Sequence, residues 1–426
     1  MTPRQPPPPD PEDPKIAELE AKLKRAYRKI RKLRREVAEL KGEAIAPRTT
    51  GKNRRSHRRN SELSWLGTFL FLIVLMAGGF WVAFRFVKPY ILSSQPTVKT
   101  PVISPKPTVS PPPQPAAASE LTYNVKTPPQ LTYSKELQAI ADGLVNLAIS
   151  QKLPTDKLSI YLIDINRQSF AEYRSQIPRF PASVTKLFWM VAVYAQVEAN
   201  LLPADTIDYD DTCKTDLCQL VKHSDNEAAS HILDRLTRTT STPQNENFED
   251  WLERRYFINR FFRSAGYHNI DVSQKNFPIA DLKMEEPERW DLKMRGNPEQ
   301  PIRNQISAEQ AGRLMYEIAT QRAVSETASD RMLDLLGRDL NPQVWRRDEN
   351  NPIAGFFGEG LVDSGVIFAS KVGWTSESRQ EVAYVRSPDG EIAYILVVFG
   401  DSPAYSNNWT IFPRISRFVF DRVKVR

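Results

Sequence analysis

The chain has 426 residues, a formal net charge of +7 and 41% hydrophobic residues, enough for two or three domains. Its charge is uneven: residues 1–62 hold 18 basic and 9 acidic residues, a net charge of +9, and the rest carries −2. The basic excess lies beside an apolar segment, where anionic lipid headgroups are a better partner than nucleic acid. We therefore predict no nucleic-acid partner. The four histidines and two cysteines show no metal-ligand spacing, so no metal or other cofactor is predicted.

The N-terminal segment divides into a proline-rich tail and an amphipathic stretch. Residues 1–14 contain too many prolines to fold. Residues 15–42 place apolar side chains at the a and d positions of nearly four heptads, flanked mainly by Lys and Arg. This spacing predicts a basic coiled coil that associates with itself or with another helix. A helix lying on lipid and a lone solvated helix are the alternatives.

A membrane anchor is predicted next along the chain. Residues 63–84 contain no charged side chain over 22 positions, and at about 1.5 Å per residue this helix would cross a bilayer core of about 30 Å. We predict a transmembrane helix over 63–87, preceded by a basic juxtamembrane segment over 43–62. Because the basic residues cluster before the span, the N-terminus is expected in the cytoplasm. The apolar run is longer than that of a cleaved signal peptide, so we expect a single-pass protein of the bacterial cytoplasmic membrane.

Residues 88–119 are interpreted as a linker, because eight prolines occur between positions 96 and 115. Residues 120–426 are long enough to bury a substantial core. Periodicity and capping residues predict helices over 134–151, 184–199, 217–236, 307–321 and 408–420, and strands over 158–165, 169–173, 381–386, 392–399 and up to Trp374. The stretch 239–305 shows no clear pattern. The order of elements predicts an α+β domain with helices at both ends of an antiparallel sheet.

Three short motifs carry the chemistry: Ser183-Val-Thr-Lys186, Ser224-Asp-Asn226 and Lys371-Val-Gly373. A serine hydroxyl needs a nearby base to become a nucleophile, and on a helix Lys186 lies one turn from Ser183. A lysine acts as a base only when burial or neighbouring positive charge lowers its pKa, and Lys371 is a candidate for that charge. Together the motifs predict a serine acyl-transfer site.

The remaining motif residues suit the substrate. Ser224 offers a second hydroxyl that passes a proton toward a leaving nitrogen, and Asn226 offers an amide for the substrate or for Lys186. Lys371 is placed to hold a substrate carboxylate. Gly373 lets the substrate lie against the strand backbone. For Ser183 and Lys186 the competing interpretation is a helix cap followed by a surface lysine.

This constellation resembles the penicillin-recognising serine enzymes, and above all the class A β-lactamases. The resemblance covers about residues 130–426, includes Arg179-Phe-Pro181 ahead of the serine, and implies the β-lactamase/transpeptidase-like fold with an all-helical lobe. It implies that Ser183 is acylated, that Lys186 and Ser224 relay protons, and that the backbone amides of Ser183 and Trp374 form the oxyanion hole. The implied partner is a β-lactam or a peptidoglycan stem peptide.

Two positions depart from the class A pattern. Val372 stands where the family usually has Thr or Ser between the lysine and the glycine, which removes a hydroxyl that contacts the substrate carboxylate. Class A enzymes release the acyl group with a glutamate in a Glu-x-x-Leu-Asn setting. Here Glu286, within Glu285-Glu-Pro-Glu288, is the candidate.

These departures keep other functions open. The segment Pro181-Ala-Ser-Val-Thr-Lys186 also resembles the nucleophile motif of D-alanyl-D-alanine carboxypeptidases, and a non-hydrolytic domain that binds cell-wall peptides is a third hypothesis. His223 is expected to be exposed. Cys213 and Cys218 pair or stay free thiols, because their separation of five residues does not decide the geometry.

Overall fold

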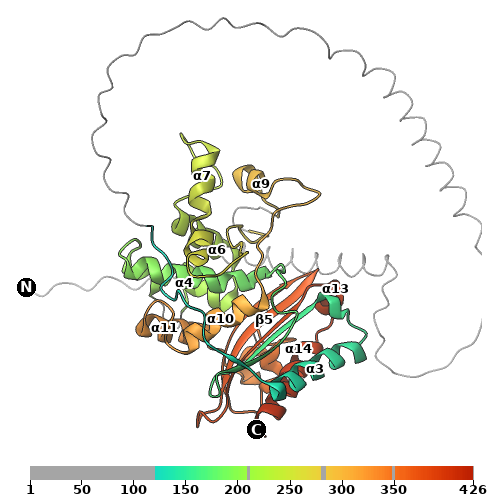
Figure 1. The fold of residues 1–426 in the computed structure, drawn as a ribbon. Coiled ribbons are helices and arrows are strands. Elements are labelled where there is room, and N and C mark those ends of the chain that lie inside the picture. The colour runs from blue at the N-terminus through green and yellow to red at the C-terminus, as the bar shows by residue number, and fades with distance from the viewer. Residues whose placement is uncertain (1–119, 209–211, 280–284, 348–350, 426) are drawn as a thin grey trace, which may run out of the picture. The chain divides into compact units, whose positions relative to one another are not determined.

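The computed structural model describes residues 120–208, 212–279, 285–347 and 351–425 (Figure 1). The predicted proline-rich tail, coiled coil, juxtamembrane segment, transmembrane helix and linker occupy residues 1–119, outside the described residues, and stay predictions. Among the helices of the described part, none is both long enough and apolar enough to cross a bilayer.

A six-stranded sheet with the strand order β1-β3-β2-β6-β5-β4 forms the centre of the domain. Its strands are β1 (Thr132–Tyr133), β2 (Leu158–Asp164), β3 (Ser169–Tyr173), β4 (Ile367–Thr375), β5 (Ser378–Arg386) and β6 (Ala393–Gly400). The pairs from β3 to β4 are antiparallel, whereas β1 runs parallel to β3. The predicted antiparallel sheet is therefore a mixed one. The sequence does not reveal β1, because two paired residues are too few to leave a pattern.

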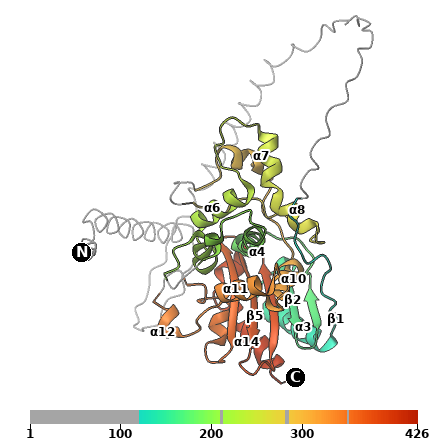
Figure 2. The same ribbon diagram turned by 90° about the vertical axis from the view of Figure 1, so that its left-hand side faces the viewer.

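Helices cover both faces of this sheet (Figures 1 and 2). Helices α3 (Lys135–Ser150) and α14 (Ile411–Val423) pack on one face, and α10 (Ala308–Ala319) packs on the other. The remaining helices are α4 (Thr185–Glu198), α5 (Asp216–Cys218), α6 (Asn226–Thr237), α7 (Phe248–Arg255), α8 (Phe257–Arg263), α9 (Arg289–Arg295), α11 (Glu326–Leu336), α12 (Pro342–Trp345) and α13 (Pro403–Asn407). Short helical turns are η1 (Thr155–Lys157), η2 (Ala182–Val184), η3 (Ala204–Ile207), η4 (Gln219–His223, a π-helix) and η5 (Phe357–Leu361).

Two hydrophobic cores lie on opposite faces of the sheet, because successive side chains of a strand point to opposite sides. In β6, Ile395, Val397 and Phe399 face the core shared with α4, α8 and α10. Their neighbours Leu396 and Val398 face the core shared with α3 and α14. Strands β2 and β6 are buried on both sides, which explains why they read as nearly continuous apolar runs, whereas β5 is buried although it begins with Ser, Arg, Gln and Glu.

Helix starts are well predicted where a side chain caps the backbone. The Ser134 side chain accepts a hydrogen bond from the Leu137 amide at 3.2 Å, and α3 begins at the next residue. Ser307 and Gln310 form both bonds of a capping box at the start of α10. The predicted strands over 158–165 and 169–173 are confirmed as β2 and β3.

The single helix predicted over 217–236 is wrong, because Ser224 interrupts it. The segment forms α5, the π-helix η4 and then α6, and Ser224 has left-handed backbone angles of φ 58° and ψ 29°. The Asp225 carboxylate accepts hydrogen bonds from the amides of Glu227 and Ala228, which starts a new helix at Asn226. This break turns the Ser224 motif out of the helix and toward the nucleophile.

A disulfide joins Cys213 and Cys218 just ahead of this break, with Cα atoms 5.3 Å apart. The pairing left open by the sequence is thus present. Both cysteines are buried, and the Cys213 carbonyl accepts a hydrogen bond from the Gln219 side chain. The cross-link ties the segment before α5 to the helix that leads into Ser224.

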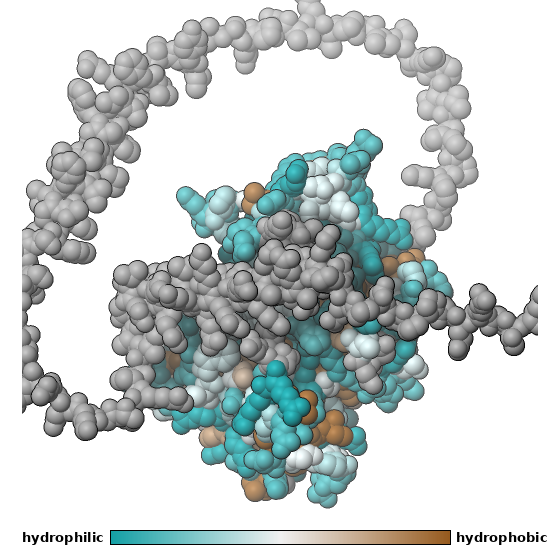
Figure 3. Space-filling view, turned by 180° about the vertical axis from the view of Figure 1, so that it is seen from behind, coloured by the Kyte–Doolittle hydropathy of each residue, from teal (hydrophilic) through white to brown (hydrophobic). Residues whose placement is uncertain are grey.

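The surface is mostly hydrophilic on the face seen in Figure 3 wherever described atoms are visible, with small scattered apolar patches. Single exposed apolar side chains such as Ile149 and Val344, 57% and 50% exposed, are ordinary for a folded domain. An exception is a pair of exposed tryptophans, Trp374 and Trp409, which lie together at a pocket.

Candidate active site

Ser183 lies in the turn η2, immediately before helix α4. The preceding Ala182 has a left-handed backbone with φ 47°, a conformation that is strained for a residue with a side chain. Helix α4 is buried on nearly all sides, so the nucleophile stands at the end of a rigid central element. Lys186, one helical turn later, is fully buried.

Strand β4 passes directly against this turn, and Gly373 makes the approach possible. A Cβ atom at Gly373 would lie 2.6 Å from the Pro181 carbonyl oxygen and 3.0 Å from the Ser183 backbone nitrogen. Real Cβ atoms do not come that close to a backbone carbonyl. The structure therefore gives Gly373 a second reason besides the predicted contact with substrate: it lets β4 lie beside the nucleophile.

Ser224 and Asn226 meet Lys186 from the start of α6. The Lys186 ammonium group donates to Asn226 Oδ1 at 2.7 Å and to the Ser224 carbonyl oxygen. Asn226 Nδ2 donates in turn to the Pro278 carbonyl oxygen at 3.0 Å. Asn226 thus holds the lysine with one end of its amide and the opposite wall of the pocket with the other.

A chain of polar atoms connects the two lysines through Ser224. Lys371 Nζ lies 2.9 Å from Ser224 Oγ, and Lys186 Nζ lies 3.5 Å from the same oxygen. Burial lowers the pKa of Lys186 from its usual value to about 7, against an opposing effect of Asp225. Burial, together with the charges of Lys186 and Arg338, holds the pKa of Lys371 well below its usual range. A lysine near neutrality can accept a proton from a serine.

A buried carboxyl group lies on β5, the strand that pairs with β4. Glu381, on β5, is fully buried and accepts a hydrogen bond from the Phe357 amide at 2.7 Å. Burial raises the pKa of Glu381 to about 8, although Arg338 and Arg379 lower it. Arg338 donates to the backbone carbonyls of Val221, Lys222 and Ser370, and so ties η4 to β4.

The other side of Ser183 is contacted by a residue from the stretch 239–305, and the sequence prediction missed it. Asn276 Nδ2 lies 3.5 Å from Ser183 Oγ and 3.3 Å from the Ala182 carbonyl oxygen. The peptide bond from Phe277 to Pro278 is cis, an arrangement found at tight turns. Among the described residues, the side chain that contacts the Ser183 hydroxyl is therefore an amide.

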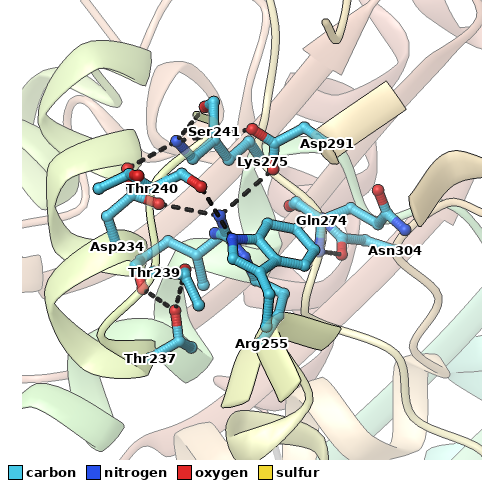
Figure 4. A network of polar contacts seen from close by, with 12 residues as sticks. Asp234, Thr237, Thr239, Thr240, Ser241, Arg255, Gln274, Lys275, Asp291 and Asn304 are labelled. Carbon is cyan, nitrogen blue, oxygen red and sulfur yellow. Dashed lines mark hydrogen bonds and ion pairs between the residues drawn. The ribbon is translucent and has the colours of Figure 1, made fainter. Parts of the chain in front are cut away.

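A cluster of buried charges holds this side of the site in place (Figure 4). Asp234 of α6 contacts Arg255 of α7 at 2.9 Å and Lys275 at 2.7 Å. Asp291 of α9 lies 3.3 Å from Arg255 and 3.8 Å from Lys275. Arg255 is fully buried and its guanidinium lies over the Trp251 ring at 4.7 Å. Burial also raises the pKa of Asp234, against the effect of both cations.

The cluster reaches the nucleophile through neighbouring backbone and amide contacts. Lys275 immediately precedes Asn276 in the chain. Asn304 pairs with the backbone of Gln274, accepting at 2.9 Å and donating at 2.7 Å, and also donates to Asn276 Oδ1 at 3.4 Å. Three helices and a distant loop thus fix the residue that faces Ser183. The sequence prediction omitted Asn276 because the charged residues that hold it in place lie mostly in a stretch without periodicity, where nothing indicates which of them are buried.

A cavity of about 710 Å³ opens beside Ser183, and Pro278 is the residue of the stretch 239–305 that lines it. The predicted residues on its lining are Ser183, Ser224, Asn226, Lys371 and Trp374.

Glu286, the candidate for releasing the acyl group, lies elsewhere. Its side chain is 83% exposed and lies 3.6 Å from Arg295, and it does not line the cavity. The structure does not bring Glu286 to the serine, because Glu286 lies ahead of α9, next to the surface, whereas the residue at the nucleophile comes from the segment before the cis proline.

Other side chains at the site play lesser parts. His223 is exposed, as expected, and lies on the cavity rim. Arg179 is buried and donates to Ser159 Oγ and to two backbone carbonyls, so it braces the turn before the serine. Within the described ranges, no group of three or more His, Cys, Asp or Glu side chains is placed to hold a metal ion.

The mixed sheet and helical lobe carry Ser183 one helical turn before the buried Lys186, and Ser224 lies between Lys186 and Lys371. This fold and site define a serine hydrolase that works through an acyl-enzyme. The sequence model of the beta-lactamase enzyme family matches residues 135–423. The chain belongs to this family.

Solved structures with a similar fold include the beta-lactamase from Sphaerobacter thermophilus DSM 20745, at 15% identity and a TM-score of 0.47, covering 68% of this chain and 98% of that one. The chain is also similar to PBP-A, at 18% identity and a TM-score of 0.47, covering 70% of this chain and 100% of that one. A variant of the last common ancestor of Gram-negative bacteria class A beta-lactamase is similar at 17% identity and a TM-score of 0.44, covering 66% and 97%. The search of curated proteins found no match.

Proposed function

We propose that this domain is acylated on Ser183 by β-lactams and by related D-alanyl amides of the cell wall, and that it releases the acyl group slowly. The proposal rests on one observation: the groups on the two sides of Ser183 differ in what they can do chemically. On one side, the chain of atoms from Lys371 through Ser224 to Lys186 is in place. On the other side, the contact to Ser183 is the amide of Asn276.

Acylation uses the first side. Neutral Lys186 takes the proton from the Ser183 hydroxyl as its oxygen attacks the carbonyl carbon of the substrate amide. The amide C–N bond then breaks, and the proton passes through the Ser224 hydroxyl to the leaving nitrogen. Lys371 Nζ lies 2.9 Å from the same hydroxyl and holds it in place for this transfer, while burial lowers the pKa of Lys186. The backbone amides of Ser183 and Trp374 are the proposed donors to the oxyanion.

Release needs a base that activates water against the ester. The family resemblance assigns that task to a glutamate, yet Glu286 is exposed and outside the cavity. An amide such as Asn276 can orient a water molecule but cannot accept its proton at neutral pH. We therefore expect the acyl-enzyme to form readily and to hydrolyse slowly, as in an enzyme that acts on peptidoglycan stems rather than in a fast antibiotic hydrolase.

The proposed location follows from the N-terminal segment. The basic region before residue 63 and the uncharged span after it support a single-pass anchor with the catalytic domain outside the cytoplasmic membrane. Protease added to intact spheroplasts tests this topology. Digestion of the C-terminal domain supports it, and protection of that domain in spheroplasts but not in lysed cells contradicts it.

The activity is tested on the full-length chain in mild detergent, beside Ser183→Ala. The reagents are a fluorescent penicillin, a chromogenic cephalosporin and a stem peptide ending in D-Ala-D-Ala. A persistent fluorescent label that Ser183→Ala abolishes supports the proposal. Rapid hydrolysis of the cephalosporin would instead establish a β-lactamase. The absence of both label and peptide cleavage would favour a domain that only binds.

A further inference from the structure

Two tryptophans form one wall of the catalytic cavity. Trp374 follows Gly373 on β4, and Trp409 precedes α14; both line the cavity that contains Ser183 and Lys371. Their ring centroids are 5.7 Å apart with planes inclined by 50°. Each side chain is 49% exposed, although tryptophan is among the most costly side chains to leave in water. Exposed apolar surface beside a polar catalytic centre is typical of a ligand site.

A fully buried arginine holds this wall rigid from behind. The Arg379 guanidinium lies 4.1 Å from the centroid of the Trp409 ring. It donates to the carbonyl oxygens of Ser406 at 2.8 Å, Gly355 at 2.9 Å and Tyr405 at 3.3 Å. Three backbone partners fix the cation, and the cation fixes one face of the indole.

The backbone around this wall contacts both indole rings closely. The Trp374 indole nitrogen donates to the Ser406 carbonyl oxygen at 3.3 Å, so that ring has a set orientation. Gly355 has φ +73°, and a Cβ atom there would lie 2.3 Å from the Trp409 ring. The loop that carries Gly355 therefore closes on Trp409 only because this residue has no side chain. A wall with fixed rings loses little freedom when it binds, which favours a ligand of matching shape.

We propose that Trp374 and Trp409 form a subsite that stacks against a flat ring of the acyl donor. The proposal rests on the proposed function and adds a substrate class to it: acyl donors that carry a ring with a flat apolar face near the reacting amide. An aryl substituent and a pyranose sugar both present such a face to an indole. The three sequence motifs do not reveal this subsite, because its two tryptophans are 35 residues apart in the chain.

Acylation of the full-length chain in mild detergent tests the subsite, with intact-mass spectrometry as the readout. One pair of reagents is the N-acetyl derivative of 6-aminopenicillanic acid and benzylpenicillin, which differ by an aryl ring on the acyl side. A second pair is two cephalosporins with the same acyl side chain and either a methyl or a dinitrostyryl group at C3, on the leaving side. For each pair we measure the ratio of the second-order acylation rate constants, ring over no ring.

Trp409→Leu keeps an apolar side chain and removes the flat face, so we expect it to lower this ratio at least fivefold for one of the two pairs. The matched control is Tyr133→Leu, an aromatic residue 51% exposed at the far edge of the sheet on β1, which should leave both ratios within twofold. Ratios that Trp409→Leu leaves unchanged for both pairs would overturn the subsite, even though acylation itself proceeds.

A binding measurement separates the two proposals. If no reagent acylates the wild-type chain, the proposed function fails. The subsite is then judged by quenching of tryptophan fluorescence with phenylacetylglycine, as the aryl probe, and with a muramyl disaccharide peptide, as the sugar probe. Saturable quenching by either probe that Trp409→Leu weakens at least fivefold supports stacking and identifies the source of the ring. No saturable quenching by either probe contradicts it.

Discussion

The two walls of the catalytic site, on either side of Ser183, are built in different ways. The first wall is made of α4, the start of α6 and β4, and its side chains come from three motifs, each of them three or four residues long. The second wall carries Asn276 and is held by buried charges from α6, α7, α9 and the segment between them. In the proposed function the first wall makes the acyl-enzyme, and the second wall decides whether water can remove the acyl group. On the second wall the group in contact with Ser183 is the amide of Asn276.

The largest expected effect comes from Lys186→Ala, which removes the proposed base from the first wall. General bases contribute roughly 10²- to 10⁴-fold to a rate, and we expect a loss of that order in the acylation rate constant with a fluorescent penicillin. Because burial lowers the pKa of Lys186 to about 7, its neutral form predominates above that pH. The wild-type rate should therefore rise with pH to a midpoint near 7 and then level.

Lys135→Ala is the control for this prediction, since Lys135 is exposed at the start of α3. It should reproduce both the rate and the pH profile of the wild type. A Lys186→Ala variant that keeps the rise of the rate near pH 7 would show that another group is the base.

Substitutions in the buried charges of the second wall should lower the stability of the domain more than they change its chemistry. Arg255→Met leaves Asp234 and Asp291 close together with Lys275 as the remaining cation, and breaking a buried ion cluster costs about 3–5 kcal/mol. At roughly 2–4 °C per kcal/mol for a domain of this size class, thermal unfolding should fall by about 6–20 °C. Differential scanning calorimetry measures the shift.

The neighbouring Arg254→Met is the matched control. Arg254 is 38% exposed and pairs with Glu246, and an exposed pair contributes only about 0–1 kcal/mol. If both substitutions lower the unfolding temperature equally, the buried cluster has no special part in holding the second wall.

An intermediate effect is expected from Asn276→Asp, which places a carboxylate where the amide meets Ser183. A carboxylate can accept a proton from water, so we expect the lifetime of the penicilloyl adduct to fall by about tenfold, less than the roughly 10²- to 10⁴-fold that a fully positioned base contributes. Chasing the fluorescent label with unlabelled penicillin measures that lifetime. Asn276→Ala serves as the comparison, and it should not shorten the lifetime if the carboxylate itself is responsible.

The smallest effect is expected from Val372→Thr on the first wall. The Val372 side chain is 7% exposed and lines the cavity, and threonine has nearly its shape. A hydroxyl that binds a substrate carboxylate is worth about 0.5–1.5 kcal/mol, equivalent to roughly 2- to 10-fold in acylation efficiency. Concentration dependence of labelling checks this, and an unchanged or lower efficiency would show that the hydroxyl is not missed at this position.

The difference between the walls also explains what could be predicted from the sequence. Ser183 and Lys186 lie at the start of one helix, and Ser224 and Asn226 at the start of another. Because residues that are close in the sequence are also close in space there, the sequence alone could predict both pairs. Lys371 could be predicted with them because it stands two residues before a glycine near the end of a predicted strand. The predicted strands and capped helices were recognised for the same reason: their signals are local.

The remainder depends on contacts between distant residues. Asn276 is placed by Asn304 and by charges on three helices. Asp234 lies on the helix predicted over 217–236, but Arg255, Asp291 and Asn304 lie in the stretch 239–305, which shows no periodic pattern. Glu286 was chosen for its resemblance to a motif, and that resemblance does not report on burial. The break at Ser224 was missed because a left-handed serine leaves the hydrophobic spacing on either side unchanged.

A time course of intact mass after mixing with benzylpenicillin tests most directly whether the acyl-enzyme forms readily and is released slowly, as we propose. We predict that the full mass of one penicillin is added to the wild-type chain, that the adduct maps to Ser183, and that it persists after free drug is removed. An adduct that never accumulates while penicilloate builds up in solution would contradict the account.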